Sequence, residues 1–116
     1  KAAYFIWKNP FMVAGGNTFI NEMLRLNHFQ NIYENNGRYP EIDLKMIRKE
    51  GDPDVVFLSS EPFPFTDEDA FEIGRFTHHA KTVFVDGEMF SWYGSRLVKS
   101  FDYFKQIQKR LELLNL

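Results

Sequence analysis

The hydrophobic positions of the chain alternate between two spacings, one typical of buried strands and one typical of amphipathic helices. Ala3–Trp7 and Val55–Leu58 are short, continuous apolar runs, which is the pattern of strands covered on both faces. Thr82–Val85 is a third run, and Phe29–Tyr33 is a further strand candidate. Turn residues bound these runs, so the pattern predicts about four strands.

A helix is predicted between Ala3–Trp7 and Phe29–Tyr33, the first two strand candidates in chain order. It begins at about Asn17, and either Asn17 or Thr18 can cap the exposed amides of its first turn. Its end is expected near Asn27-His28. The apolar positions recur at helical spacing and form one stripe: Phe19, Ile20, Met23, Leu24 and Leu26.

Three more helices follow from local start and stop signals. Asp43 begins one whose left-handed C-terminal cap is Gly51, and Thr66–Asp69 is a capping-box-like start for the next. That helix runs through Phe71, Ile73 and Phe76 and is expected to close at His78-His79. A long amphipathic helix is predicted from about Ser95 almost to Leu116.

Strands that alternate with helices predict an α/β fold. We expect a three-layer αβα sandwich around a mostly parallel, doubly wound sheet of about four strands, formed as a single domain by residues 1–116. Ligands of such sheets bind at the carboxyl ends of the strands. Four loops occupy those positions: Lys8 to Gly16, Gly37 to Glu41, Ser59 to Thr66, and Asp86 to Arg96.

Composition narrows the functional classes. The 116 residues carry 14 Lys and Arg against 16 Asp and Glu, without a dense basic run, so we expect no nucleic-acid partner. The chain has no Cys, which excludes thiolate catalysis and Cys-based metal sites. Its apolar runs are too short to span a membrane.

The most informative loop is Asp86 to Arg96. It places Trp92 and Tyr93 in a polar stretch beside Arg96, at the start of a helix. One interpretation is an aromatic platform with a cation for a flat or anionic ligand. The other is a Trp that anchors its loop and an Arg that pairs with Asp86 or Glu88. The residues alone do not separate the two.

Other polar groups favour structural roles. Glu61 is a candidate ligand contact, but a carboxylate before a helix more often serves electrostatics or capping. The acids of Thr66–Asp69 are explained by capping. Gly15-Gly16 precedes a helix but belongs to neither a GxGxxG nor a GxxxxGK[ST] motif.

The three histidines do not predict a metal site. Adjacent side chains on one helix point about 100° apart, so His78 and His79 are expected to be exposed residues at a helix end. They should lie at the edge of the sheet opposite the ligand-binding loops. Neither a GxSxG elbow nor a Ser near a His in those loops is present, so we expect no catalytic residues, no cofactor and no enzymatic activity.

A resemblance covers essentially the whole chain. Its most specific segments are Asp52–Phe65, with Ser-Ser-Glu-Pro-Phe-Pro-Phe, and Asp86–Arg96, with Trp-Tyr-Gly-Ser-Arg. Together with Asn-Pro-Phe-Met and Arg-Tyr-Pro-Glu-Ile, they resemble the C-terminal lobe of substrate-binding proteins of ABC importers for vitamin B12, ferric siderophores and haem. The two lobes of such proteins are joined by a long backbone helix.

The resemblance implies a function without chemistry on the ligand. A metal chelate such as cobalamin, a ferric siderophore or haem would bind between this lobe and a second one, in a longer chain located in the periplasm or anchored as a lipoprotein. This lobe alone would bind weakly or not at all, and its exposed cleft face could self-associate. The implied ligand-binding residues are Trp7, Asn9, Phe11, Met12, Tyr39, Glu61, Asp86, Trp92, Tyr93 and Arg96.

The same resemblance implies docking onto a membrane permease. The family usually carries an acidic residue early in the helix after the Tyr-Pro segment, where this chain has Lys45, and Glu41 is the acidic residue that could substitute. Glu41 and Lys45 are therefore the candidate docking positions. Two other functions stay open. One is an α/β enzyme whose catalytic residues lie mostly in the N-terminal half of a longer chain, and the other is a lobe that binds a protein partner or acts as a sensor.

Overall fold

The computed structural model describes residues 1–61 and 63–86. The predicted helix from Ser95 to Leu116 lies outside them, as do Trp92, Tyr93 and Arg96. No helix in the described ranges combines the length and apolar character needed to cross a membrane. In chain order, the elements are β1 (Ala2–Trp7), β2 (Met12–Val13), α1 (Phe19–Leu26), η1 (Leu44–Met46), α2 (Ile47–Glu50), β3 (Val55–Ser59), α3 (Asp67–Phe76) and β4 (Lys81–Val85).

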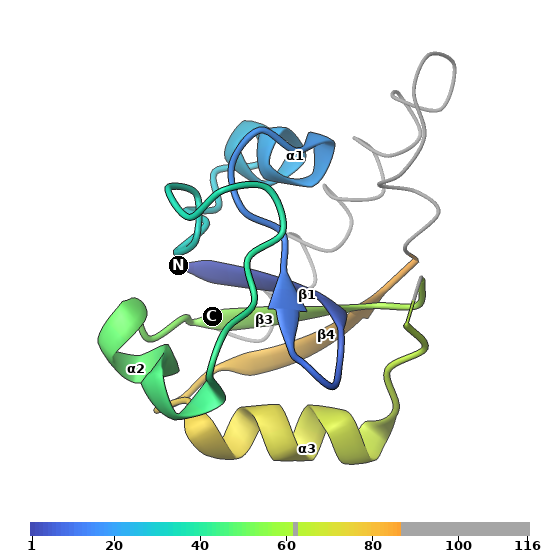
Figure 1. Ribbon diagram of the computed structural model, residues 1–116. Helices are drawn as coiled ribbons and strands as arrows, with labels where there is room; N and C mark the ends of the chain where they lie inside the picture. The colour runs from blue at the N-terminus through green and yellow to red at the C-terminus, as the bar shows by residue number, and fades with distance from the viewer. Residues whose placement is uncertain (62, 87–116) are drawn as a thin grey trace.

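The strands form one mixed sheet of order β2-β1-β3-β4. β1 pairs in parallel with β3, and β3 in parallel with β4, whereas the short β2 runs antiparallel to β1. α1 covers one face of the sheet, and α2 and α3 cover the other (Figure 1). The prediction of three αβα layers around a mostly parallel sheet is therefore confirmed.

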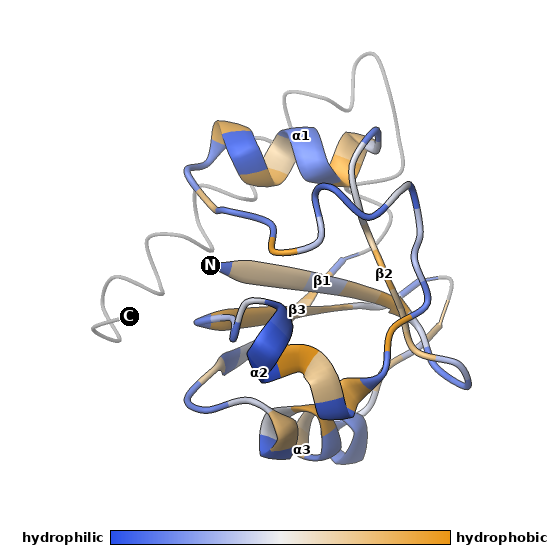
Figure 2. Cartoon of the chain, turned by 60° about the vertical axis from the view of Figure 1, so that its left-hand side comes forward, coloured by the Kyte–Doolittle hydropathy of each residue, from blue (hydrophilic) through white to orange (hydrophobic). Residues whose placement is uncertain are grey.

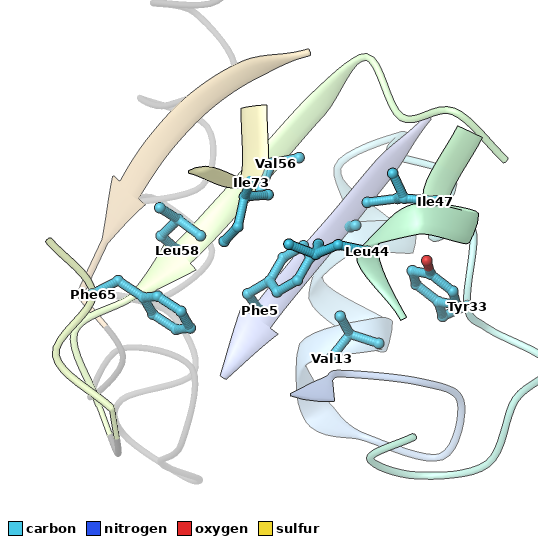
Figure 3. Close-up of a cluster of buried hydrophobic side chains, with 10 residues drawn as sticks. Phe5, Val13, Tyr33, Leu44, Ile47, Val56, Leu58, Phe65 and Ile73 are labelled. Atoms are coloured by element: carbon cyan, nitrogen blue, oxygen red, sulfur yellow. The ribbon is translucent and has the colours of Figure 1, made fainter. Parts of the chain in front are cut away.

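Alternate residues of the central strands face opposite helix layers. Val55 and Phe57 of β3 belong to the cluster under α1, whereas Val56 and Leu58 belong to the cluster under α2 and α3. All five residues of β3 are buried, as its continuous apolar pattern predicted. Figure 3 shows the second cluster, and Figure 2 shows the hydrophilic stretches on the connecting loops and the helices.

Side-chain caps fix the helix starts. The Thr18 hydroxyl accepts the Asn21 N–H at 3.0 Å and begins α1, so Thr18 and not Asn17 is the cap. Thr66 and Asp69 form a reciprocal capping box at α3, as predicted. Asp43 accepts the Lys45 N–H and begins the 3-10 turn η1, which α2 continues.

Two predicted features of the helices are wrong. Leu26 is 51% exposed, because α1 buries a narrower stripe than its apolar pattern suggests. α3 ends at Phe76 with Thr77 as its C-cap, before the histidines. The C-cap of α2 is Gly51, as predicted, with a positive φ of 154° that favours glycine, and Asp52 follows it at φ 46°.

Phe29–Tyr33 is not a strand. Only Asn31 makes a bridge, in parallel with Ala2. The Asn31 side chain accepts the Tyr33 N–H at 3.0 Å and donates to the Ala14 carbonyl at 2.9 Å, so it turns the chain away from the sheet. β2 was not predicted either, because two residues are too few to produce a sequence pattern.

Candidate ligand-binding edge of the sheet

Trp7 is the aromatic residue that ends β1, at the carboxyl edge of the parallel strands. Its side chain is 39% exposed. Trp7 pairs with Met12 of β2, and Met12 bridges to Glu41, so these three predicted site residues form one row across neighbouring chain segments. Met12 is half-buried, and Glu41 is exposed.

The Trp7 indole is held by a second aromatic ring. Phe63 packs edge-on against it, with centroids 5.6 Å apart and planes at 72°. Phe63 in turn contacts Phe65 at 4.8 Å, and Phe65 contacts Phe5 at 6.5 Å. Phe11, a predicted ligand contact, is half-buried and packs edge-on against Phe5 at 5.9 Å. A continuous row of rings therefore connects the hydrophobic core with the exposed indole.

Phe63 was missed as a site residue. The loop after β3 was already selected by its place at the end of a strand, but Glu61 alone was chosen from it. The signal was available in the sequence, because Phe63 and Phe65 alternate with prolines and can place one ring outward and one inward. In the structure, Phe65 is buried and Phe63 is half-buried.

Glu61 and Asp86 follow the other two parallel strands at the same edge. Ser59 shapes the turn: its hydroxyl donates to the Glu61 carbonyl and accepts the Glu61 N–H. Both carboxylate residues are exposed. The capping role considered for Glu61 is filled by the Thr66 and Asp69 box. The described part of this edge thus combines exposed aromatic surface with acidic groups.

The loop that carries Tyr39 runs along β2. The Val13 N–H donates to the Pro40 carbonyl at 3.1 Å, and the Gly15 N–H donates to the Arg38 carbonyl at 2.7 Å. Tyr39 is 41% exposed, and the Arg38 guanidinium lies 5.8 Å from the centre of its ring. The second predicted loop is therefore brought beside the first.

The turn between β1 and β2 is fixed by an ion pair with α3. The Lys8 ammonium lies 2.6 Å from Asp69 Oδ1 and 3.3 Å from Glu72 Oε1. Burial favours a higher pKa for Asp69, but hydrogen bonds from Lys8 and Thr66 outweigh it and hold that pKa below its usual range. The hydrogen bond to Asp69 raises the pKa of Lys8. Lys8 is thus occupied in positioning the turn.

Asn9 and the two docking candidates are also on the surface. Asn9 is exposed in the β1–β2 turn with φ 61°, a left-handed conformation that asparagine tolerates. Glu41 is exposed on the segment that leads into η1, and Lys45 is exposed within η1. The geometry places Trp7, Met12 and Glu41 together, with Glu61 and Asp86 farther along the same edge.

Comparison of structures identifies the architecture. No protein-family model and no curated protein matches the sequence significantly. The periplasmic haem-binding protein HutB of Vibrio cholerae superposes on 95% of this chain with a TM-score of 0.73 and 17% identity. A possible iron-binding (periplasmic solute-binding) protein from Staphylococcus epidermidis superposes on 86%, with a TM-score of 0.71 and 20% identity.

A periplasmic solute-binding protein from Veillonella parvula gives a TM-score of 0.50 over 67% of the chain at 23% identity. The chain spans 46%, 41% and 23% of the lengths of these three structures, respectively. All three are described as binding proteins. The likeness confirms the fold that the sequence resemblance implied. The chain has the fold of one lobe of a periplasmic solute-binding protein.

Proposed function

We propose that this chain is one lobe of the substrate-binding component of an ABC importer, and that it contributes one wall of a cleft for a metal chelate. Haem, a ferric siderophore and cobalamin are the candidate cargoes. The lobe acts from the periplasm, or from a lipoprotein anchor facing the exterior, as the C-terminal part of a longer chain. It delivers its cargo to a membrane permease and performs no chemistry on it.

The exposed Trp7 is the observation that carries this proposal. An indole at the carboxyl edge of a parallel sheet lies where α/β folds bind ligands, and its broad apolar face suits a macrocycle or an aromatic chelate. Phe63 holds the ring at 72°, which limits its motion before a ligand arrives. Two structural neighbours are described as haem-binding and iron-binding, which supports iron chelates among the cargoes.

A single lobe covers one face of a ligand, so binding by this chain alone is expected to be weak. The remaining proposed contacts are Asn9, Phe11, Met12, Tyr39, Glu61, Asp86, Trp92, Tyr93 and Arg96. Glu41 and Lys45 are proposed as docking positions for the permease. Charge reversal at Lys45, which lies in η1 outside the row of Trp7 and Met12, is expected to reduce transport and leave ligand affinity unchanged.

The test is an absorbance titration with haem, cobalamin and ferric siderophores, applied to this chain and to a longer chain that joins it to an N-terminal lobe. We expect one ligand class to bind saturably, more tightly to the two-lobe protein. Trp7→Ala should weaken that binding about tenfold, the equivalent of one lost stacking contact.

Phe71→Ala is the matched control, because Phe71 is 71% exposed on α3, away from the carboxyl edge. Its removal should leave affinity unchanged. Equal losses from Trp7→Ala and Phe71→Ala would indicate nonspecific adsorption to exposed rings. The absence of saturable binding by either protein would refute the proposed function.

A further inference from the structure

A second group of polar side chains lies at the opposite edge of the sheet. Asp52 precedes β3, and His78 and His79 precede β4. β3 and β4 are parallel neighbours with Val55 opposite Lys81, so the segments before them lie side by side. As the sequence indicated, the histidines are far from the carboxyl edge that carries Trp7.

The side chains of Asp52, His78 and His79 converge. One ligand atom from each lies within 4.8 Å of the other two. His78 Nδ1 is 3.8 Å from Asp52 Oδ2, and the His78 backbone N–H donates to Asp52 Oδ1 at 3.1 Å. Asp52 has a left-handed backbone, at φ 46°, and its carboxylate contacts His78 of the segment before β4.

The objection to paired chelation by the histidines does not hold in this structure. It assumed that both residues lie on one helix, but α3 ends at Phe76 and the chain then bends. The two imidazoles are neighbours, with ring centroids 5.5 Å apart and planes at 76°. Their side chains are 73% and 53% exposed, so both can rotate by the small amount that coordination requires.

A fourth residue, Asp54, contacts the imidazole of His79. His79 Nε2 lies 2.7 Å from Asp54 Oδ1. A carboxylate on one imidazole nitrogen is the usual means of orienting a histidine whose other nitrogen binds a metal. Asp54 is therefore a positioning residue.

We propose that Asp52, His78 and His79 form a Zn²⁺ site, with water completing the coordination. Two imidazole nitrogens and one carboxylate oxygen are a donor set that Zn²⁺ commonly takes. A bound ion would join the segment before β3 to the segment before β4. It would therefore stabilise this side of the sheet without contact with the cleft at the other edge.

The test is isothermal titration of the 116-residue chain with ZnCl₂ in a buffer that does not chelate zinc. We expect one Zn²⁺ per chain. His78→Ala and His79→Ala should each weaken binding about tenfold or more. Asp52→Asn should do the same, because asparagine tolerates the left-handed backbone and can accept the His78 N–H but provides no carboxylate.

His28→Ala is the matched control. His28 is also exposed and also has a left-handed backbone, at φ 66°, but it follows α1 on another side of the fold. Zinc affinity should be unchanged in this variant and in Trp7→Ala, which separates the zinc site from the proposed cleft. Melting curves without zinc show whether each variant is folded, and zinc should raise the melting temperature only where His78, His79 and Asp52 are intact.

Three results would overturn the proposal. They are the absence of saturable zinc binding by the wild-type chain, an equal loss in His28→Ala and His78→Ala, and undiminished affinity in a folded His78→Ala/His79→Ala variant. None of them bears on the proposed binding of a metal chelate at the carboxyl edge.

Discussion

The Lys8–Asp69 ion pair allows a quantitative prediction, because it joins the turn after Trp7 to the start of α3. Lys8 Nζ and Asp69 Oδ1 are 2.6 Å apart, and the side chains of Lys8 and Asp69 are 24% and 7% exposed, respectively. A hydrogen bond to a charged group contributes about 1.5–3 kcal/mol. Lys8 retains some contact with water, so Lys8→Met is expected to lower the free energy of unfolding by about 2 kcal/mol.

Asp69→Ala should cost more, because Asp69 also belongs to the capping box. The lost cap adds about 1 kcal/mol, which gives a total of about 3 kcal/mol. Once Asp69 is absent, Lys8 has lost its main partner. The double variant Lys8→Met/Asp69→Ala should therefore be about as stable as Asp69→Ala alone.

Urea unfolding followed by circular dichroism measures all four members of this cycle. Glu72→Ala is the control, since Glu72 is 3.3 Å from Lys8 but its side chain is 43% exposed, and such a pair contributes about 1 kcal/mol or less. An equal loss of stability from Lys8→Met with and without Asp69 would show that the two residues are not energetically coupled and would contradict the prediction.

Three more predictions concern packing, pH and the exposed edge. A Cβ on Gly15 would lie 2.1 Å from the Gly37 carbonyl oxygen, so Gly15→Ala should lower the free energy of unfolding in urea by about 1–3 kcal/mol. A Cβ on Gly74 meets no atom within 4 Å, so Gly74→Ala should raise that free energy by roughly 0.5–1 kcal/mol. A Gly15→Ala variant more stable than Gly74→Ala would contradict this prediction. The pKa of Asp69 is lower in the folded than in the unfolded protein, so its stabilising contribution is present above about pH 4 and is lost as the pH falls through the folded pKa. The urea midpoint should therefore fall less in acid for Asp69→Asn than for the wild type. An equal pH dependence of the two midpoints would contradict this prediction. Self-association of the lobe should appear as a sedimentation coefficient that rises with concentration and should weaken in Trp7→Ser; a strictly monomeric wild type would refute it.

The central fold could be predicted because its signals are local and redundant. The continuous apolar run of β3 requires burial on both faces, and the caps Thr18, Asp43 and Thr66 each mark a helix start. Phe29–Tyr33 was mistaken for a strand because its apolar residues outweighed Asn31. The role of that one side chain depends on Ala14, a distant neighbour that the sequence pattern cannot supply.

The position of the candidate site could be predicted from the sequence, but the contacts that hold its side chains could not. The rule for strand ends selected the loops that contain Glu61 and Asp86 and the loop that directly follows Trp7, and the structure places all three residues at one edge. The contact between Trp7 and Phe63 depends on how two loops meet after β1 and β3 pair. The group of Asp52 and the histidines was missed for a different reason: α3 stops two residues earlier than expected, which changes where both imidazoles lie.

β2 is the outer strand of the sheet on the side of β1, and this edge affects how copies of this lobe can associate. β2 is only two residues long, and its outer neighbour includes Pro40, which has no N–H to donate. An edge so short and interrupted is a poor template for adding a strand from another molecule. Association on that side would therefore proceed through the side chains of Trp7 and Tyr39, and would leave the amount of β-structure unchanged.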